Sequence, residues 1–197
     1  MFDLYTQALT LLQRWPGIGP SASHRLLEFF LQDAQKNKTL HKLGNLMTSF
    51  KQCQKCHLYH AVTSECTNCL QSNTTTIMII TSPVDYFFCQ QHHFFKKHRF
   101  FCLNGYVSPH QGKTLDNTNL NDIIDQLKYI PPQKLYLLFN QSLEARATTW
   151  LLRKNISEIH QIYECASLLR EKEALHYLTS HDRDQYIESL SNLMNQA

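Results

Sequence analysis

Four cysteines have the spacing of a metal site. Cys53 and Cys56 form one Cys-x2-Cys pair, and Cys66 and Cys69 form a second pair after nine intervening residues. Each pair can place two thiolates on one tight turn, and two such turns complete a tetrahedron around Zn²⁺. Four protein ligands leave no position open for water, so the predicted zinc is structural. Two disulfides are the alternative, which is less favoured in a chain expected to be cytoplasmic.

Other residues with reactive side chains are expected to be neither metal ligands nor nucleophiles. His57 and His60 lie between the cysteine pairs and could compete as ligands, but a complete set of four cysteines predicts that they are spectators. Cys89, Cys102 and Cys165 each stand alone among apolar residues, which favours small core residues over nucleophiles.

A glycine-rich turn, PGIGP at residues 16–20, lies between two predicted helices. Apolar residues recur at helical spacing over 3–15, and Ser21 is a plausible N-cap for a second helix that runs to about Gln35. This is the form of a helix-hairpin-helix. Its glycines let the backbone approach a phosphate, and the amides at the start of the second helix point at that anion.

The hairpin predicts DNA binding that is independent of base sequence and sensitive to salt. A simple turn between two helices is the alternative. The candidate DNA-binding residues lie in or beside the turn, and they are Arg14, Gly17, Ile18, Gly19, His24 and Arg25.

Charge and composition agree with an anionic partner for the first half of the chain. Residues 1–60 carry seven Lys/Arg against three Asp/Glu, whereas residues 116–197 carry eight against eleven. Of the 197 residues, 43% are hydrophobic and 18% are charged, which predicts compact domains and not a disordered chain. No apolar run reaches the roughly 20 residues of a membrane span, and the first residues do not resemble a signal peptide. We therefore expect a cytoplasmic protein, associated with the nucleoid and not with a membrane.

The second half of the chain predicts an α/β domain. Buried strands are expected at 77–80, 100–103, 135–139 and 159–163, and helices at 83–93, 120–127, 143–152 and 183–195. Strands that alternate with helices imply a parallel sheet. With a third helix at about 38–51, the predicted domains are a helix-hairpin-helix module at 1–52, a zinc knuckle at 53–70 and an α/β domain at 76–197.

The basic and aromatic residues over 92–101 allow two interpretations. They could follow a nucleic-acid backbone, or the phenylalanines could fill the core while the Lys and Arg side chains stay in solvent. The second interpretation is favoured.

In this order, the motifs resemble those of the RecR family of recombination mediators. The segments that carry the resemblance are PGIGPSASHR, CQKC, CTNC, IMIITSPVD, VSPHQG and LYLLFNQSLEARATTWLL, and they span nearly the whole chain. The resemblance implies a Toprim-like α/β domain, a homo-oligomer (a dimer or a tetrameric ring) on single- or double-stranded DNA, and partners similar to RecO and RecF. It also implies that the protein helps to load a recombinase at gaps during DNA repair.

The sequence departs from the family pattern at several positions. Thr81 stands where the family usually has a glutamate, and Ser21 where a lysine is common. In the stretch after the later strand only Asn140 and Glu144 agree, and these two are the candidate partner-binding residues of the Toprim surface. A glycine-rich loop of the family is replaced by CASLLR at 165–170.

These departures bear on enzymatic activity. Toprim enzymes hold Mg²⁺ with a glutamate and an Asp-x-Asp pair, and the matching positions here lack both. The pair of Asp182 and Asp184 lies late, before a predicted helix, where capping explains it better. We expect no catalytic residues and no enzymatic activity. The alternatives are a Toprim-type metal-dependent nuclease or primase, or a zinc scaffold that has lost DNA binding.

Overall fold

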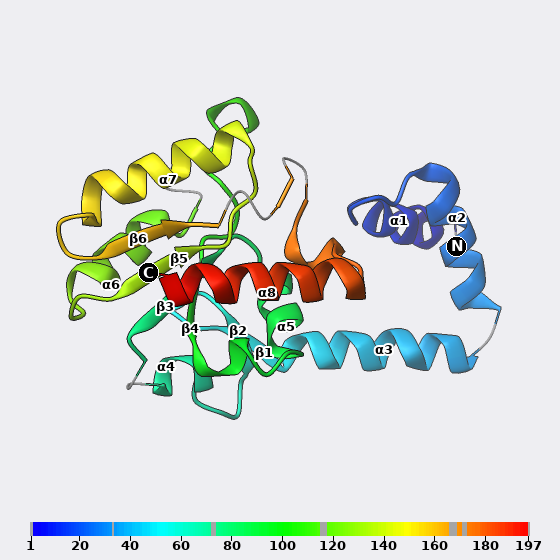
Figure 1. The fold of residues 1–197 in the computed structure, drawn as a ribbon. Helices are drawn as coiled ribbons and strands as arrows, with labels where there is room; N and C mark the ends of the chain where they lie inside the picture. The colour runs from blue at the N-terminus through cyan, green and yellow to red at the C-terminus, as the bar shows by residue number, and fades with distance from the viewer. Residues whose placement is uncertain are drawn as a thin grey trace. The chain divides into compact units, whose positions relative to one another are not determined.

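The computed structural model describes residues 2–32, 34–71, 74–114, 118–165, 169–170 and 173–196. The chain divides into two compact units, Met1–Phe50 and Lys51–Ala197 (Figure 1). Part of the loop in which the sequence departs from the RecR pattern, residues 166–168, lies outside the described residues. Within the described part of the chain, every helix is too short or too polar to cross a membrane.

The first unit contains three helices, α1 (Phe2–Gln13), α2 (Pro20–Leu31) and α3 (Ala34–Thr48). α1 packs against α2, and α2 packs against α3. Leu12 and Leu27 are the buried apolar side chains described in this unit. The unit therefore has a small core for its length.

The start of α2 corrects one prediction. The N-cap is Gly19, in an extended conformation, and Ser21 lies inside the first turn. Pro20 takes the first helical position because its fixed φ suits a helix and its missing N–H is not needed there. The helix therefore begins directly at the end of the glycine turn.

The second unit contains a four-stranded parallel sheet, as predicted. Its strand order is β4-β3-β5-β6, with Ile77 in register with both Arg99 and Leu135. The strand bounds are β3 (Thr76–Ile80), β4 (Arg99–Cys102), β5 (Lys134–Leu137) and β6 (Gln161–Glu164). The two central strands are almost completely buried, which explains why their sequences are continuous apolar runs.

Helices cover both faces of this sheet. They are α5 (Pro83–Gln90), α6 (Leu120–Lys128), α7 (Leu143–Ile156) and α8 (Ser180–Gln196), with short 3-10 turns at Phe95–Lys97, Pro109–Gln111 and Leu175–Tyr177. The connection from β3 to β4 moves across the sheet in one direction, and the connections from β4 to β5 and from β5 to β6 move in the other direction. Right-handed crossovers therefore place α5 on one face, and α6 and α7 on the other. α8 lies beside α5, where the Arg183 guanidinium is 5.5 Å from the centre of the Phe88 ring.

The start of α8 refines the expectation for Asp182 and Asp184. Both lie inside the first turns of the helix and not before it. The Asp182 carboxylate accepts a hydrogen bond from the Thr179 hydroxyl at 2.6 Å, and the Asp182 amide donates to Thr179 Oγ1 at 3.2 Å. Thr179 is therefore the residue that caps the helix, while in these two contacts the Asp182 carboxylate bonds a hydroxyl and not a main-chain amide, so the capping role expected of the aspartates belongs to Thr179.

The basic and aromatic stretch contributes to the core. Phe95, Phe100 and Phe101 are fully buried, while Lys96 and Lys97 are exposed. The core interpretation of the phenylalanines is therefore confirmed.

Candidate metal centre and nucleic-acid interface

Two tight turns present the four cysteines. The first follows β1 (Phe50–Gln52), which pairs with β2 (Tyr59–Ala61). In this turn the Cys53 amide donates to the Leu58 carbonyl, and His57 has a φ of +59°. The second turn is closed by α4 (Thr67–Leu70), where the Cys69 amide donates to the Cys66 carbonyl at 3.0 Å.

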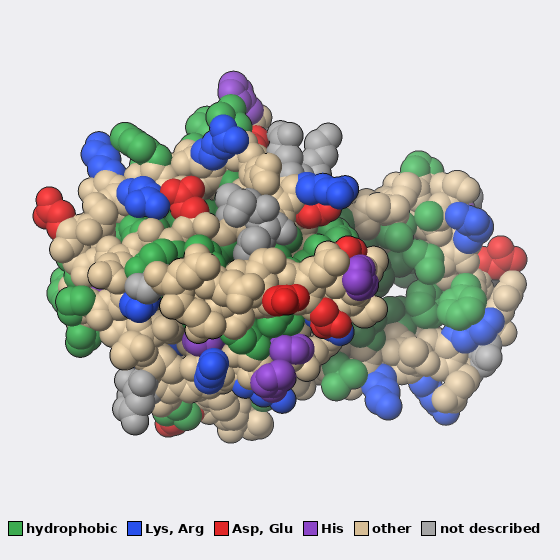
Figure 2. Space-filling view, in the orientation of Figure 1, with side chains coloured by type: hydrophobic (Ala, Val, Ile, Leu, Met, Phe, Trp, Pro, Cys, Tyr) green, Lys and Arg blue, Asp and Glu red, His purple; other side chains and the backbone are tan. Residues whose placement is uncertain are grey.

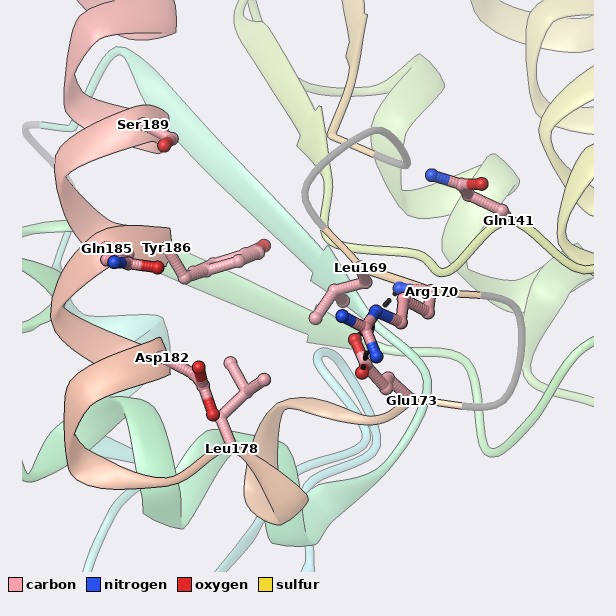
Figure 3. Close-up of a pocket in the computed structure, with 9 residues that line it drawn as sticks. All are labelled: Gln141, Leu169, Arg170, Glu173, Leu178, Asp182, Gln185, Tyr186 and Ser189. Atoms are coloured by element: carbon pink, nitrogen blue, oxygen red, sulfur yellow. Dashed lines mark hydrogen bonds and ion pairs between the residues drawn. The ribbon is translucent and has the colours of Figure 1, made fainter.

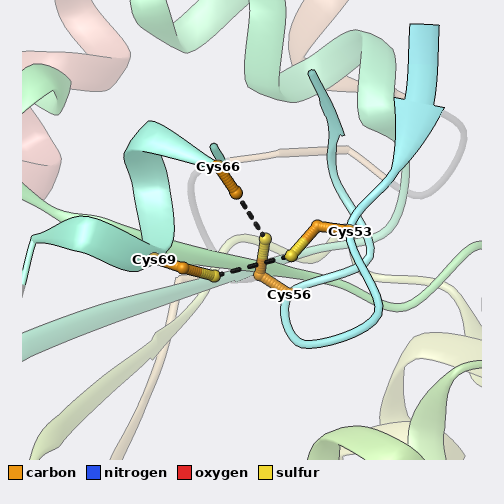
Figure 4. A group of neighbouring side chains, drawn as sticks. All are labelled: Cys53, Cys56, Cys66 and Cys69. Atoms are coloured by element: carbon orange, nitrogen blue, oxygen red, sulfur yellow. Dashed lines mark hydrogen bonds between the residues drawn. The ribbon is translucent and has the colours of Figure 1, made fainter. Parts of the chain in front are cut away.

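The four thiols converge from these turns (Figure 4). Their sulfur atoms all lie within 4.8 Å of one another, with Cys53 and Cys69 at 3.7 Å and Cys56 and Cys66 at 3.5 Å. A tetrahedral zinc with Zn–S bonds of about 2.3 Å requires S···S separations of about 3.8 Å. The group can therefore hold a metal ion, and both its donor atoms and its size fit zinc. Zinc bound by four thiolates would act as a structural cross-link.

The thiols differ in how readily they lose a proton. Hydrogen bonding from Cys56 lowers the pKa of Cys69 to about 5, and the positive charge of Arg99 contributes to the same effect. Burial raises the pKa of Cys66 to about 11, and hydrogen bonding to Cys69 together with burial raises the pKa of Cys56. The raised pKa values of Cys56 and Cys66 mean that metal binding has to displace protons from these thiols.

The knuckle is joined to the edge strand of the sheet. The Asn68 side-chain amide donates to the Phe100 carbonyl at 2.9 Å, and the Phe100 amide donates to Asn68 Oδ1 at 2.7 Å. The Cys102 amide also donates to the Cys56 carbonyl at 3.0 Å. Cys56 and Leu58 belong to the same buried core as the sheet. The candidate metal centre is thus built into the second unit.

One side of the cluster opens to a cavity of about 580 Å³. Cys53, Cys66 and Cys69 line it together with the cationic side chains of Lys51 and Lys55. A metal ion held here would be reachable by a small chelator from this side.

Neither histidine of the knuckle belongs to the group of ligand atoms that could hold a metal. His57 is buried, with Nε2 3.7 Å from the Asp122 carboxylate, and burial lowers its pKa. His60 lines the cavity. The group of ligand atoms close enough to hold a metal comprises the four cysteines.

The predicted DNA-binding residues lie on one hairpin. Gly17 has a φ of +79°, a conformation that favours glycine, and the Ile18 amide donates to the Trp15 carbonyl to close the turn. The first amides of α2, those of Ser21 and Ala22, have no acceptor within the helix. These amides are available to an anion at the hairpin.

The side chains around the turn are mostly exposed. Arg14, His24 and Arg25 are exposed, whereas Ile18 is half-buried. His24 Nδ1 is hydrogen-bonded to the Tyr5 hydroxyl at 3.0 Å, which fixes its ring against α1. Arg25 carries no such restraint among the described hydrogen bonds and ion pairs.

The predicted Toprim surface lies at the carboxyl edge of the sheet. Thr81 follows β3, and Asn140 follows β5. The Asn140 amide group donates to the Glu173 carbonyl, and its Oδ1 accepts from the Ser142 amide. Asn140 is therefore engaged in positioning the start of α7, and Glu144 is half-buried in the first turn of that helix.

A second cavity, of about 380 Å³, lies between α8 and the segments that follow β5 and β6 (Figure 3). The Tyr186 hydroxyl points into it from α8. The carboxylates of Glu173 and Asp182 in its lining are already engaged, since Glu173 contacts Arg170 and Asp182 accepts a hydrogen bond from the Thr179 hydroxyl. This cavity does not resemble the clustered carboxylates of a Mg²⁺ site.

The three remaining cysteines are fully buried, and burial raises the pKa of each thiol, to about 12 for Cys102 and Cys165. Such thiols are poor nucleophiles, as expected for core residues.

Two structural contacts escaped the sequence analysis. The contact of Asn68 with the main chain of Phe100 was not predicted, although Asn68 lies within the CTNC motif. The spacing of cysteines does not show which main-chain groups a neighbouring side chain will bind. Asp85 is buried and accepts hydrogen bonds from the amide and the imidazole of His176, 91 residues away. No local signal links the two.

The chain is similar to recombination proteins of the RecR type. No protein-family model matches it. It is 26% identical over 161 residues to recombination protein RecR of Chlamydia caviae, which covers 79% of each chain. The identity is 26% over 174 residues with RecR of Chlamydia felis (85% of this chain and 83% of that protein) and 25% over 173 residues with RecR of Coxiella burnetii (85% of each). The mixed α/β fold and the cysteine cluster are consistent with a divergent RecR-like protein.

Proposed function

We propose that this protein is a non-enzymatic mediator of recombination in DNA repair. It binds DNA without sequence preference and helps to load a recombinase at gaps. The observation that carries the proposal is the similarity to RecR proteins along about four fifths of the chain. We include in the proposal partners similar to RecO and RecF, a homo-oligomeric state and a cytoplasmic location, which the same similarity supports.

In the proposed mechanism the hairpin holds phosphates. Anions bind to the free amides at the start of α2, and Arg25 and Arg14 add positive charge. Contacts to phosphate carry no base information, so affinity depends on charge and salt.

The knuckle and the sheet domain have supporting roles in this mechanism. Zinc bound by Cys53, Cys56, Cys66 and Cys69 stabilises the knuckle. The surface around Asn140 and Glu144 receives partner proteins. Thr81 stands where a glutamate is usual, and the stretch after the later strand lacks the Asp-x-Asp pair of Toprim enzymes, which supports a role without phosphoryl transfer.

A salt titration of DNA affinity tests the hairpin. Arg25→Ala should weaken binding to a random-sequence duplex and lower the slope of log K against log salt by about 1, as expected for one lost phosphate contact. Gly17→Val should also weaken binding, because valine is strained at a φ of +79°. Gly44→Ala is the control, since Gly44 lies within α3 and a Cβ there meets no neighbour within 4 Å.

The outcomes separate the proposal from its rivals. Unchanged affinity in both hairpin variants would show that the hairpin does not bind DNA, as in a zinc scaffold that has lost this function. Mg²⁺-dependent cleavage or synthesis by the purified protein would show a Toprim enzyme instead.

A further inference from the structure

The outer face of α7 carries large apolar side chains in solvent. Leu143 is 76% exposed and Trp150 is 59% exposed, two helical turns apart, or about 10 Å along the axis. Ala147 and Lys154 continue the same stripe, since residues three and four apart lie on one face. The opposite face of α7 is buried through Thr148, Leu152 and other residues. The fold of the second unit therefore does not use this outer stripe.

Positive charge flanks the two apolar residues. Lys154 lies beside Trp150, with its ammonium 5.2 Å from the ring centre. Arg146 is exposed, and no ion pair is formed by it among the described residues. Arg153 differs, because its guanidinium is bound to the Glu164 carboxylate at 2.8 Å. In Figure 2 basic and hydrophobic side chains lie over α7, at the upper left of the view, with acidic side chains among them.

We propose that this face, formed by Leu143, Arg146, Ala147, Trp150 and Lys154, binds an acidic segment of a partner protein that carries large apolar residues. Exposed Trp and Arg side chains are typical anchors of protein interfaces. The apolar residues of the segment would cover Leu143 and Trp150, and its carboxylates would meet Arg146 and Lys154. The inference rests on the partner-binding part of the proposed function, which it makes more specific, and it does not require DNA binding.

The geometry favours a protein segment over a nucleic acid. Base stacking requires an open aromatic face, and the Lys154 ammonium lies over one face of the Trp150 ring. Leu143, the most exposed apolar residue of the stripe, gains little from a phosphate backbone. Covering Leu143 and Trp150 together removes apolar surface from water, which is the main driving force of association between proteins.

Trp150 provides the signal for a direct test. The chain has one other tryptophan, Trp15, and a Trp15→Phe background leaves Trp150 as the only fluorophore of its kind. The probe is a helical peptide of about 14 residues, or four turns, with leucines on one face and glutamates beside them. A second peptide has lysine in place of each glutamate, and the third ligand is an oligo-dT.

The acidic peptide should shift Trp150 emission to the blue and protect it from acrylamide quenching, and the lysine peptide should not. Trp150→Ala and Arg146→Glu, measured with labelled peptide by anisotropy, should each weaken binding about tenfold or more. Tyr129→Ala is the matched control, since Tyr129 is an 89% exposed aromatic residue at the end of α6, and this variant should bind normally.

Three results would overturn the inference. They are an acidic peptide that fails to bind, equal affinity of the Trp150→Ala variant, or protection of Trp150 by oligo-dT in place of the peptide. Loss of DNA binding in the hairpin variants would leave this test unaffected.

Discussion

At the scale of single residues, the four knuckle cysteines differ sharply from the other three. The knuckle sulfurs converge to within 4.8 Å, whereas Cys89, Cys102 and Cys165 lie singly in the core. A ligand of a structural zinc stabilises the fold through the metal, while a core thiol stabilises it only by packing.

Cys56→Ser should therefore lower the zinc content well below one per chain and lower the unfolding temperature, because Cys56 is fully buried and completes the tetrahedron. Metal analysis and thermal unfolding measure both effects. Cys89→Ala is the control and should retain one zinc per chain. Full zinc content in the Cys56 variant would show that the cluster is not the metal site.

His98 predicts a pH dependence of stability. It is buried, with its ring 5.4 Å from Phe94, and burial lowers the pKa of His98 to about 4 from an ordinary 6.5. Above pH 6.5 the imidazole is neutral in both the folded and the unfolded chain, so it does not make the free energy of unfolding depend on pH. Below pH 6.5 the unfolded chain takes up the proton first, so stability falls as the pH falls towards 4.

The lowered pKa of His98 corresponds to a loss of at most about 3 kcal/mol of unfolding free energy between pH 6.5 and 4. His98→Phe has no titrating group, so its stability should fall less over this range. Urea unfolding at several pH values compares the two proteins. Parallel pH profiles would show that His98 is not the source of the dependence.

At the scale of elements, the knuckle extends the sheet through a side chain. The Asn68 amide pairs with both the N–H and the C=O of Phe100, much as a neighbouring strand would, at the outer edge of β4. This edge is thereby covered, which protects it from pairing with another chain.

Asn68→Ala should cost about 2–4 kcal/mol of unfolding free energy, because it leaves two buried main-chain groups without partners. Asn68→Asp should not restore stability, since a carboxylate would face the Phe100 carbonyl. Asn155→Ala removes an exposed amide bound to Leu151 within α7 and should change stability by less than about 0.5 kcal/mol. Urea unfolding of zinc-saturated protein distinguishes these cases, and equal stability of the two alanine variants would contradict the prediction.

At the scale of the whole molecule, the first unit exposes many large apolar residues. Leu4 and Leu11 of α1, which recur at helical spacing, are 70% and 59% exposed. On α3, Leu43, Leu46 and Met47 are 45–59% exposed at positions that share one helix face. Exposed apolar surface of this extent is typical of an interaction site.

We expect a second copy of the chain to cover the apolar face of α3. The full chain should then sediment as a dimer or a larger assembly, and a variant with both Leu46→Glu and Met47→Glu should dissociate at least about tenfold more readily. Lys42→Glu changes the charge of α3 without removing apolar surface and is the control. Sedimentation velocity over a range of concentrations measures the effect. A doubly substituted variant that sediments as the original protein does would place self-association elsewhere.

The sequence by itself was enough to predict the cysteine cluster and the parallel α/β domain. Both depend on short-range patterns: two residues between paired thiols, and continuous apolar runs for strands that are buried on both faces. Strand and helix ends were off by a few residues, because a strand ends where its neighbours stop pairing, which no local pattern records. The hairpin residues and the partner surface at Asn140 and Glu144 remain predictions.

Only the tertiary structure showed what these elements meet. Asn68 and Phe100, and Asp85 and His176, are distant in the chain and have no local signature, since their contacts arise from packing of the whole unit. The exposure of Trp150 could likewise not be predicted from the sequence, because a tryptophan on an amphipathic helix is expected on the buried side of that helix. Spacing therefore determined the candidate metal ligands, and packing decided which surfaces remain available to a partner.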